Sequence, residues 1–225
     1  MQKIRNLAFV TDFDGTITDD DFFQYVKEAF FDASALAPWD AYMNGKMTHF
    51  DALKMMYGSI RAPLSEMLAV VQKVHVEPFV VPTFDILHQA GIPIYITSAG
   101  CDYYIELLLG DVIKKYNIQL ITNPSSYAPE TGMKMKKHPA NYRFYDHAVG
   151  ISKAKIVEYL QSKGKTVIFA GDGPPDIDPA RIADVVFARK ILLALCTEEN
   201  IKTEIFDTYE NIYKYFDKIL KQEHE

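Results

Sequence analysis

Residues 6–16 read NLAFVTDFDGT, and this stretch decides the fold of the chain. Its first half is a short apolar run of the kind that a buried parallel strand shows. Residues 12–16 are rich in Asp, Gly and Thr, so we expect a loop there. Asp12 is therefore predicted at the carboxyl end of a buried strand, with Asp14 two residues further on.

Beyond this strand the sequence is first helical and then alternates between helix and strand. The helical block contains no convincing strand, and its helices are expected at residues 21–31, 35–43, 48–59 and 64–75. In the later part, strands are expected at 92–97, 119–123, 166–170 and 185–187. The helices there are expected at 81–89, 103–109, 152–162 and 179–183, and two more helices end the chain. Residues 124–150 have weak periodicity, which indicates a hairpin or an irregular excursion.

Strands that alternate with helices predict an α/β fold with a Rossmann-like parallel sheet covered on both faces. The helical block then reads as an insertion after the first strand. We predict a core domain of residues 1–18 and 78–225 and a helical cap domain of residues 19–77. Ligands of open parallel sheets bind at the carboxyl ends of the strands, so the chemistry is expected there.

Composition excludes several classes of protein. The chain has 225 residues, 48% of them hydrophobic, which is enough for a sizeable buried core. Its formal charge of −6 gives no general attraction to polyanions, so we expect no nucleic-acid partner. No apolar run approaches the about 18–20 residues that cross a bilayer. Residues 1–6 lack the pattern of a secretory signal, and the two cysteines lack metal-ligand spacing, so a cytoplasmic location is expected.

Polar clusters recur where predicted strands end or helices begin. An isolated Asp-x-Asp is often only a loop or a helix cap, but here Gly15 and Thr16 follow, and their backbone N–H groups can form an anion-binding nest. The other clusters are Thr97-Ser98-Ala99-Gly100, Lys153 near a helix start, and Gly171-Asp172-Gly173-Pro174-Pro175-Asp176. Together they suit phosphoryl transfer, in which a cation and fixed donors must neutralise the phosphate before a carboxylate attacks.

In chain order these clusters resemble the four motifs of the haloacid dehalogenase superfamily of aspartate-nucleophile phosphatases. Those motifs are an Asp-x-Asp, a Ser or Thr, a Lys, and a Gly-Asp-x-x-x-Asp, and the resemblance spans essentially the whole chain. It implies a hydrolase that forms an aspartyl-phosphate on Asp12. Asp14 would protonate the leaving group and then deprotonate the water that cleaves the intermediate.

The resemblance also implies a metal site for Mg²⁺. Its ligands would be Asp12, the main-chain carbonyl of Asp14, and Asp172, a set of hard oxygen donors that suits this ion. Asp176 would orient Lys153 or a metal-bound water.

Phosphate binding falls, by the same resemblance, to Ser98 and Lys153. The backbone N–H groups of Gly15, Ala99 and Gly100 would assist them. Two alternatives remain at this point: Ser98 could be a helix N-cap, and Lys155 could replace Lys153 as the motif lysine.

The helical insertion resembles the C1-type cap of the phosphoserine-phosphatase-like branch, and cap residues are the candidates for substrate specificity. Asp21 falls where that branch often reads a substrate amine, although carboxylates also favour the start of a helix. Phe22 and Phe23 are core residues or, if they face the site, favour a less polar substrate than serine. The arginine that phosphoserine enzymes use for the substrate carboxylate falls at or beside Tyr57.

Two further runs, residues 98–104 and 187–193, look like the group of 2-hydroxy-3-keto-5-methylthiopentenyl-1-phosphate phosphatases and phosphocholine/phosphoethanolamine phosphatases. The expected function is a Mg²⁺-dependent phosphomonoester hydrolase that acts on a small phosphorylated metabolite. One alternative is a phosphotransferase or mutase of the same superfamily. Another, from a different class, is a non-catalytic phosphate-binding or receiver-type protein.

Overall fold

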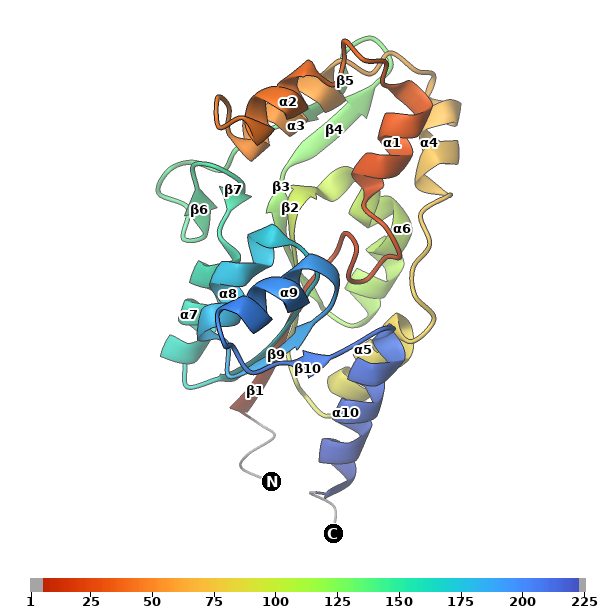
Figure 1. Ribbon diagram of the computed structural model, residues 1–225. Coiled ribbons are helices and arrows are strands. Elements are labelled where there is room, and N and C mark those ends of the chain that lie inside the picture. The colour runs from red at the N-terminus through yellow and green to blue at the C-terminus, as the bar shows by residue number, and fades with distance from the viewer. Residues whose placement is uncertain (1–5, 223–225) are drawn as a thin grey trace.

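The computed structural model describes residues 6–222 and has a six-stranded parallel sheet at its centre (Figure 1). Its strand order is β10-β9-β8-β1-β2-β3. The strands are β1 (Leu7–Asp12), β2 (Ile94–Cys101), β3 (Gln119–Asn123), β8 (Thr166–Gly171), β9 (Val185–Ala188) and β10 (Glu204–Ile205). The predicted α/β fold with a parallel sheet is confirmed. Residues 1–5 and 223–225, which include the segment considered for a secretory signal, lie outside the described residues.

The central strand β1 explains why both faces of the sheet are covered. Successive side chains of a strand point to opposite faces, so Phe9 belongs to one apolar cluster and Ala8 and Val10 to another. On the Phe9 face lie the helices α5 (Val80–Gln89), α6 (Asp102–Lys115) and α10 (Tyr209–Gln222). On the opposite face lie α7 (Lys153–Ser162), α8 (Ile177–Ile182) and α9 (Lys190–Glu198). A short 3-10 turn, η2 (Pro174–Asp176), precedes α8.

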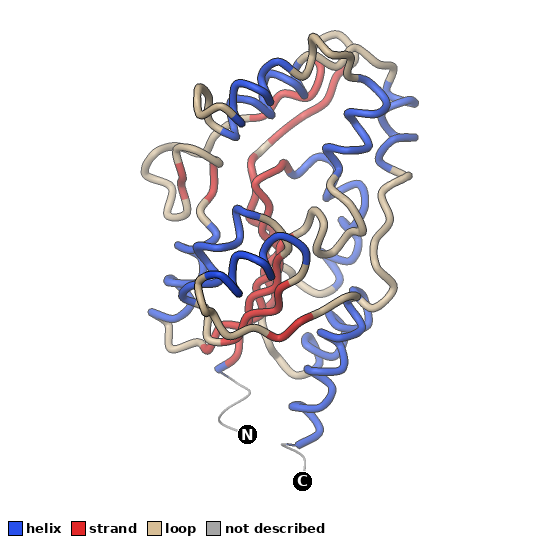
Figure 2. The backbone as a smooth tube through the Cα atoms, viewed as in Figure 1, coloured by secondary structure: helices blue, strands red, loops and turns tan. Residues whose placement is uncertain are grey.

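The helical block between β1 and α5 lies beyond the carboxyl end of the sheet (Figure 2). Its helices are α1 (Phe22–Phe30), α2 (Ala37–Met43), α3 (His49–Gly58) and α4 (Leu64–Val71). The two segments that connect it to the core run side by side, since Thr18 and Val76 form an antiparallel bridge and Glu77 N donates to Ile17 O at 3.0 Å. The boundaries of a separate cap domain stay a prediction.

Residues 124–150 form two small antiparallel pairs rather than one irregular excursion. The first joins β4 (Ser125–Ala128) to β5 (Gly132–Met135), and the second joins β6 (Tyr145–Asp146) to β7 (Gly150–Ile151). The first hairpin packs against the helical block: Tyr127 Oη donates to Ala62 O at 2.6 Å. At Gly132 a Cβ atom would lie 2.6 Å from Gly58 O, so only glycine permits this approach.

Several expected elements differ from the structure; for example, α4 ends at Val71 instead of at residue 75. Strand β2 continues to Cys101 instead of ending at 97, through a register shift between Thr97 and Cys101 that marks a β-bulge. Helix α6 continues past Leu109 to Lys115, because buried packing of its first half outweighs the low helix propensity of Gly110. The edge strand β10 was missed because two exposed residues show no alternation. Within the described residues, no helix is long and apolar enough to span a membrane.

Candidate active site

The polar clusters meet in one cavity of about 500 Å³ at the carboxyl end of the sheet. Asp12 ends β1, Ser98 lies in β2, and Asp172 follows β8. Lys153 begins α7 and lines the same cavity. Because β1 is paired with both β2 and β8, the ends of these strands are necessarily neighbours.

Lys153 lies between two carboxylates. Its Nζ donates to Asp12 Oδ1 at 2.5 Å and to Asp176 Oδ1 at 2.6 Å, and all three side chains are buried. Burial lowers the pKa of Lys153, but the charges of Asp12 and Asp176 outweigh burial and hold the pKa above its usual value. Lys153 therefore remains charged. Lys155, the alternative motif lysine, donates instead to Tyr145 O at 2.7 Å, outside the cavity.

Three carboxylates converge beside this lysine. One oxygen from each of Asp12, Asp172 and Asp176 lies within 4.8 Å of the others. Burial raises the pKa of Asp12 in spite of Lys153, and burial together with Asp176 raises the pKa of Asp172 to about 6. Like charges held this close in a buried site favour a bound divalent cation, and carboxylate oxygens are what a hard ion such as Mg²⁺ prefers. The residues present fit such an ion.

Asp14 is not part of that cluster, and both of its side-chain oxygens accept hydrogen bonds. Oδ1 accepts from Phe22 N at 3.1 Å. Oδ2 accepts from Ser98 Oγ at 3.0 Å and from Tyr104 Oη at 2.5 Å. Burial raises the pKa of Asp14, and the Tyr104 hydroxyl opposes that shift. Tyr104 was not among the predicted site residues; the only signal was its place in the run 98–104.

The bulge of β2 shapes the second motif. Gly100 N donates to Ser98 Oγ at 2.9 Å, and the cap residue of α6 is Cys101, so Ser98 is not a helix cap. Asn123, which the sequence did not single out, donates from Nδ2 to the carbonyl oxygens of Ala99 and Gly100, both at 3.0 Å. A Cβ at Gly100 would lie 2.2 Å from Tyr104 Oη. The loop therefore has a fixed shape in which Ser98, Ala99 and Gly100 line the cavity.

Close packing and backbone hydrogen bonds fix the position of Gly15. Its φ of +72° suits glycine, and a Cβ there would lie 2.2 Å from Asp172 Oδ2. Its carbonyl accepts from Arg189 Nη2 at 2.6 Å and from Lys190 Nζ at 3.0 Å. Its N–H donates to Thr18 Oγ1 at 3.1 Å, so this amide, expected to bind phosphate, is paired within its own loop.

Arg189 is a buried anchor that sequence reasoning missed as a functional residue. Besides Gly15 it donates to the carbonyl of Thr18 at 3.0 Å and to Glu77 Oε1 at 2.5 Å. Glu77 Oε2 in turn accepts from Tyr209 N at 2.5 Å. The contacts tie the Asp12–Asp14 loop to both connecting segments and to α10. The signal in the sequence was the place of Arg189 in the run 187–193.

Of the candidates for substrate specificity, three line the cavity and one lies in the core. Asp21, Phe23 and Tyr57 line the cavity. Phe22 is fully buried and stacks on the Tyr104 ring at 4.0 Å between centroids, so it is a core residue. Asp21 occupies the cap position of α1 but its side chain caps nothing there. Burial, with the charge of Asp14, raises the pKa of Asp21 to about 6.

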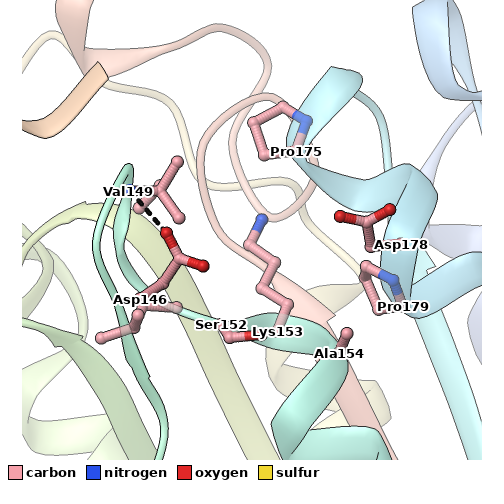
Figure 3. A pocket seen from close by; sticks show the side chains of 10 residues that line it. Asp146, Val149, Ser152, Lys153, Ala154, Pro175, Asp178 and Pro179 are labelled. Carbon is pink, nitrogen blue, oxygen red and sulfur yellow. Dashed lines mark hydrogen bonds between the residues drawn. The ribbon is translucent and has the colours of Figure 1, made fainter. Parts of the chain in front are cut away.

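A second, smaller pocket of about 50 Å³ lies against Lys153 (Figure 3). Its wall includes Asp146, which accepts from Val149 N at 2.9 Å, and Asp178. The volume suits a few water molecules rather than a substrate. The larger cavity is therefore the candidate active site.

Sequence comparisons show the family to which the chain belongs. The sequence matches the family described as Putative Phosphatase over residues 7–212. It is 25% identical over 227 residues to Pdp3-interacting factor 1 of Schizosaccharomyces pombe, covering 97% of this chain and 98% of the relative. It is 25% identical over 203 residues to the 2-hydroxy-3-keto-5-methylthiopentenyl-1-phosphate phosphatase of Bacillus mycoides, covering 89% and 91%.

Solved structures share the fold at low sequence identity. A substrate-bound phosphoserine phosphatase matches with a TM-score of 0.65 at 16% identity, covering 93% of this chain and 98% of that one. A HAD family hydrolase from Salmonella enterica matches with a TM-score of 0.66 at 16% identity, covering 91% and 69%. The family match covers most of its length, so the chain belongs to the Putative Phosphatase family and is a phosphatase, and its fold is that of the phosphoserine phosphatase structure.

Proposed function

We propose that this phosphatase hydrolyses a small phosphorylated metabolite with Asp12 as the nucleophile. The observation that carries the proposal is the buried Asp12 carboxylate, which ends the central strand and accepts a 2.5 Å hydrogen bond from Lys153. Lys153 cancels part of the repulsion that a carboxylate and a phosphate would otherwise feel.

In the first step an Asp12 oxygen attacks phosphorus, and the ester P–O bond breaks. Asp14 gives a proton to the departing oxygen, so an alcohol leaves and an aspartyl-phosphate remains. Ser98 and the backbone N–H of Ala99 would hold the phosphoryl oxygens, whereas the Gly100 N–H, also expected to bind phosphate, is paired with Ser98 Oγ. Tyr104 fixes the Asp14 carboxyl group through its hydrogen bond during this proton transfer.

In the second step Asp14, now ionised, takes a proton from a water that attacks phosphorus. The bond between phosphorus and Asp12 breaks, inorganic phosphate leaves, and Asp14 is protonated again for the next cycle. Asp14 therefore serves as acid and then as base.

Mg²⁺ is the proposed cofactor, supported by the three converging carboxylates. Asp12, Asp172 and the main-chain carbonyl of Asp14 would hold it, and Asp176 would orient Lys153. When bound, the ion supplies positive charge to the phosphoryl oxygens.

Two further expectations belong to the proposal. We propose a small-molecule substrate rather than nucleic acid, in keeping with the net charge of −6. We propose a cytoplasmic location, in keeping with the free, buried thiols of Cys101 and Cys196.

The alternatives differ in the fate of the phosphoryl group. A phosphotransferase or mutase passes it from Asp12 to an organic acceptor, and a receiver-type protein keeps it. Asp14 argues against the receiver, because this partly buried carboxyl group lies two residues from Asp12, where a base can activate a hydroxyl group that removes the phosphoryl group. Release of inorganic phosphate distinguishes hydrolysis from transfer.

The test is turnover of p-nitrophenyl phosphate under Mg²⁺ with release of inorganic phosphate measured. Asp12→Asn should lower kcat at least about a thousandfold, because the amide oxygen is a poor nucleophile. Asp217→Asn, the same change at a surface salt bridge on α10, is the control and should keep wild-type activity. Normal activity in the Asp12 variant would reject this nucleophile, and phosphate found only on an organic acceptor would favour the transferase.

A further inference from the structure

The cap side of the cavity is walled by aromatic rings. We call Phe23, Trp39, Tyr42 and His49 the aromatic wall; they come from α1, α2 and α3 and all line the cavity. Phe23 stacks on Trp39 with centroids 4.6 Å apart, and His49 contacts the rings of Tyr42 at 5.3 Å and Trp39 at 5.8 Å. Rings that hold one another in this way present a preformed flat, apolar surface.

Positive charge is confined to the opposite, sheet side of the cavity. The lysines that line the cavity are Lys153 and Lys190. Lys153 is bound by carboxylates, and Lys190 Nζ donates to two main-chain carbonyls and lies 3.3 Å from Asp172 Oδ2. The charged residues that line the cavity on the cap side are the acids Asp20 and Asp21. A leaving group with its own carboxylate would meet acids there and no basic partner.

His49 supplies an unsatisfied polar atom within the aromatic wall. It is the first residue of α3, whose start is fixed by Thr48 Oγ1 accepting from Asp51 N at 3.1 Å. Burial, and then the charge of Lys153, lower the pKa of His49 to about 4, so the imidazole is neutral at pH 7. Its Nδ1 is buried and has no hydrogen-bond partner among the described residues. Such an atom is destabilising until a ligand or water pairs with it.

We infer that the aromatic wall selects a leaving group without a carboxylate, one that has a flat or apolar part against Trp39 and Phe23 and a hydroxyl group paired with His49. A hydroxyl suits either tautomer of the imidazole because it both donates and accepts. The apolar character continues to the rim, where Met43 and Ile191 are 68% and 55% exposed. The inference rests on the proposed function, because it describes the alcohol that this phosphatase releases.

The test uses phosphonates of similar length, which bind without being hydrolysed. Their Kd values are measured by calorimetry for 2-phenylethyl-, 3-hydroxypropyl-, propyl- and 2-carboxyethylphosphonate. The phenyl compound should bind about tenfold more tightly than the propyl compound, and the hydroxyl compound about fivefold more tightly. The carboxylate should bind most weakly. Trp39 is the single tryptophan, so its fluorescence should change when the phenyl compound binds.

Variants assign each preference to its residue. Trp39→Ala should remove the preference for phenyl over propyl, whereas His49→Phe should remove only the preference for hydroxyl. Met55→Ala, on the exposed face of α3, is the control and should keep both. Preferences that survive in both wall variants, or tightest binding of the carboxylate by the wild type, would overturn the inference.

The same titrations separate this inference from the proposed function. Binding of inorganic phosphate to each variant reports on the sheet side alone. If p-nitrophenyl phosphate is hydrolysed through Asp12 but the phosphonate preferences are absent, only the inference about the aromatic wall fails. If the preferences are present without turnover, the proposed function fails and the wall stands as a binding surface.

Discussion

The sheet side of the cavity pairs its polar groups, whereas the aromatic wall leaves one polar atom without a partner among the described residues. On the sheet side, Lys153 bridges two carboxylates and Asp14 accepts three hydrogen bonds. In the wall, ring contacts dominate and the buried Nδ1 of His49 has no partner among the described residues. The groups proposed for catalysis are therefore held in place by the core, whereas the proposed recognition surface keeps a polar atom that a ligand could pair.

Removal of divalent metal should affect the two sides of the cavity most differently, because it should lower turnover and leave the aromatic wall unchanged. A chelator should lower turnover about a thousandfold, because Asp12, Asp172 and Asp176 then repel the phosphate without compensation. Mg²⁺ should restore activity, and the larger Ca²⁺ should not. Trp39 fluorescence should be the same before and after chelation, since the wall holds no proposed metal ligand. Full activity after exhaustive chelation would contradict the metal assignment.

Arg189→Met should destabilise the region where the sheet side meets the helical block. Removing the guanidinium leaves the buried Glu77 carboxylate unpaired, and the free energy of unfolding should fall by about 3 kcal/mol, measured by urea titration. The double variant Glu77→Gln/Arg189→Met should lose less than the sum of the two single changes. Arg181→Met is the matched control, because Arg181 is 46% exposed in its salt bridge and should lose at most about 1 kcal/mol. Equal losses in the two arginine variants would argue against Arg189 as a buried anchor.

Because the Nδ1 atom of His49 is buried in the aromatic wall, this residue should make the free energy of unfolding of the protein depend on pH. Its pKa in the folded protein, about 4, lies below the ordinary value of 6.5, so the unfolded chain takes up the proton first as the pH falls. The contribution of the neutral His49 imidazole to the free energy of unfolding is complete above pH 6.5 and is lost as the pH falls from there to pH 4. From pH 7 to pH 5 the wild type should therefore lose about 2 kcal/mol more than His49→Gln.

The control for this measurement is His88→Gln, because His88 is an exposed histidine of α5. Urea titrations of this variant at the two pH values should follow the wild type. If His49→Gln also follows the wild type, its imidazole is not held neutral in the wall.

Much of the fold was predictable because a few local signals agree. The apolar run before Asp12 predicted the central strand, and the other polar clusters lie where parallel strands end or the next helix begins, so the topology brings them into one cavity. Such convergence is a property of parallel sheets and follows once the strand order is set. The placement of Lys153 rather than Lys155 follows from the first turn of α7, whose start is fixed by Ser152.

The rest depends on contacts between distant parts of the chain. Tyr104 meets Asp14, and Arg189 meets Gly15 and Glu77, across separations that no local pattern encodes. Phe22 and Phe23 are neighbours of one residue type, yet one is core and the other lines the cavity, because successive residues of a helix point in different directions.

The measurement that tests the central claim most directly is the identification of a phosphorylated residue during turnover. With p-nitrophenyl phosphate as the substrate, whose leaving group needs no proton from Asp14, Asp14→Asn should slow the second step more than the first and let the intermediate accumulate. Acid-quenched protein can then be analysed by mass spectrometry. The account predicts one phosphoryl group on Asp12 that hydroxylamine removes. A phosphoryl group on another residue, or continued turnover with no phosphorylated protein, would contradict it.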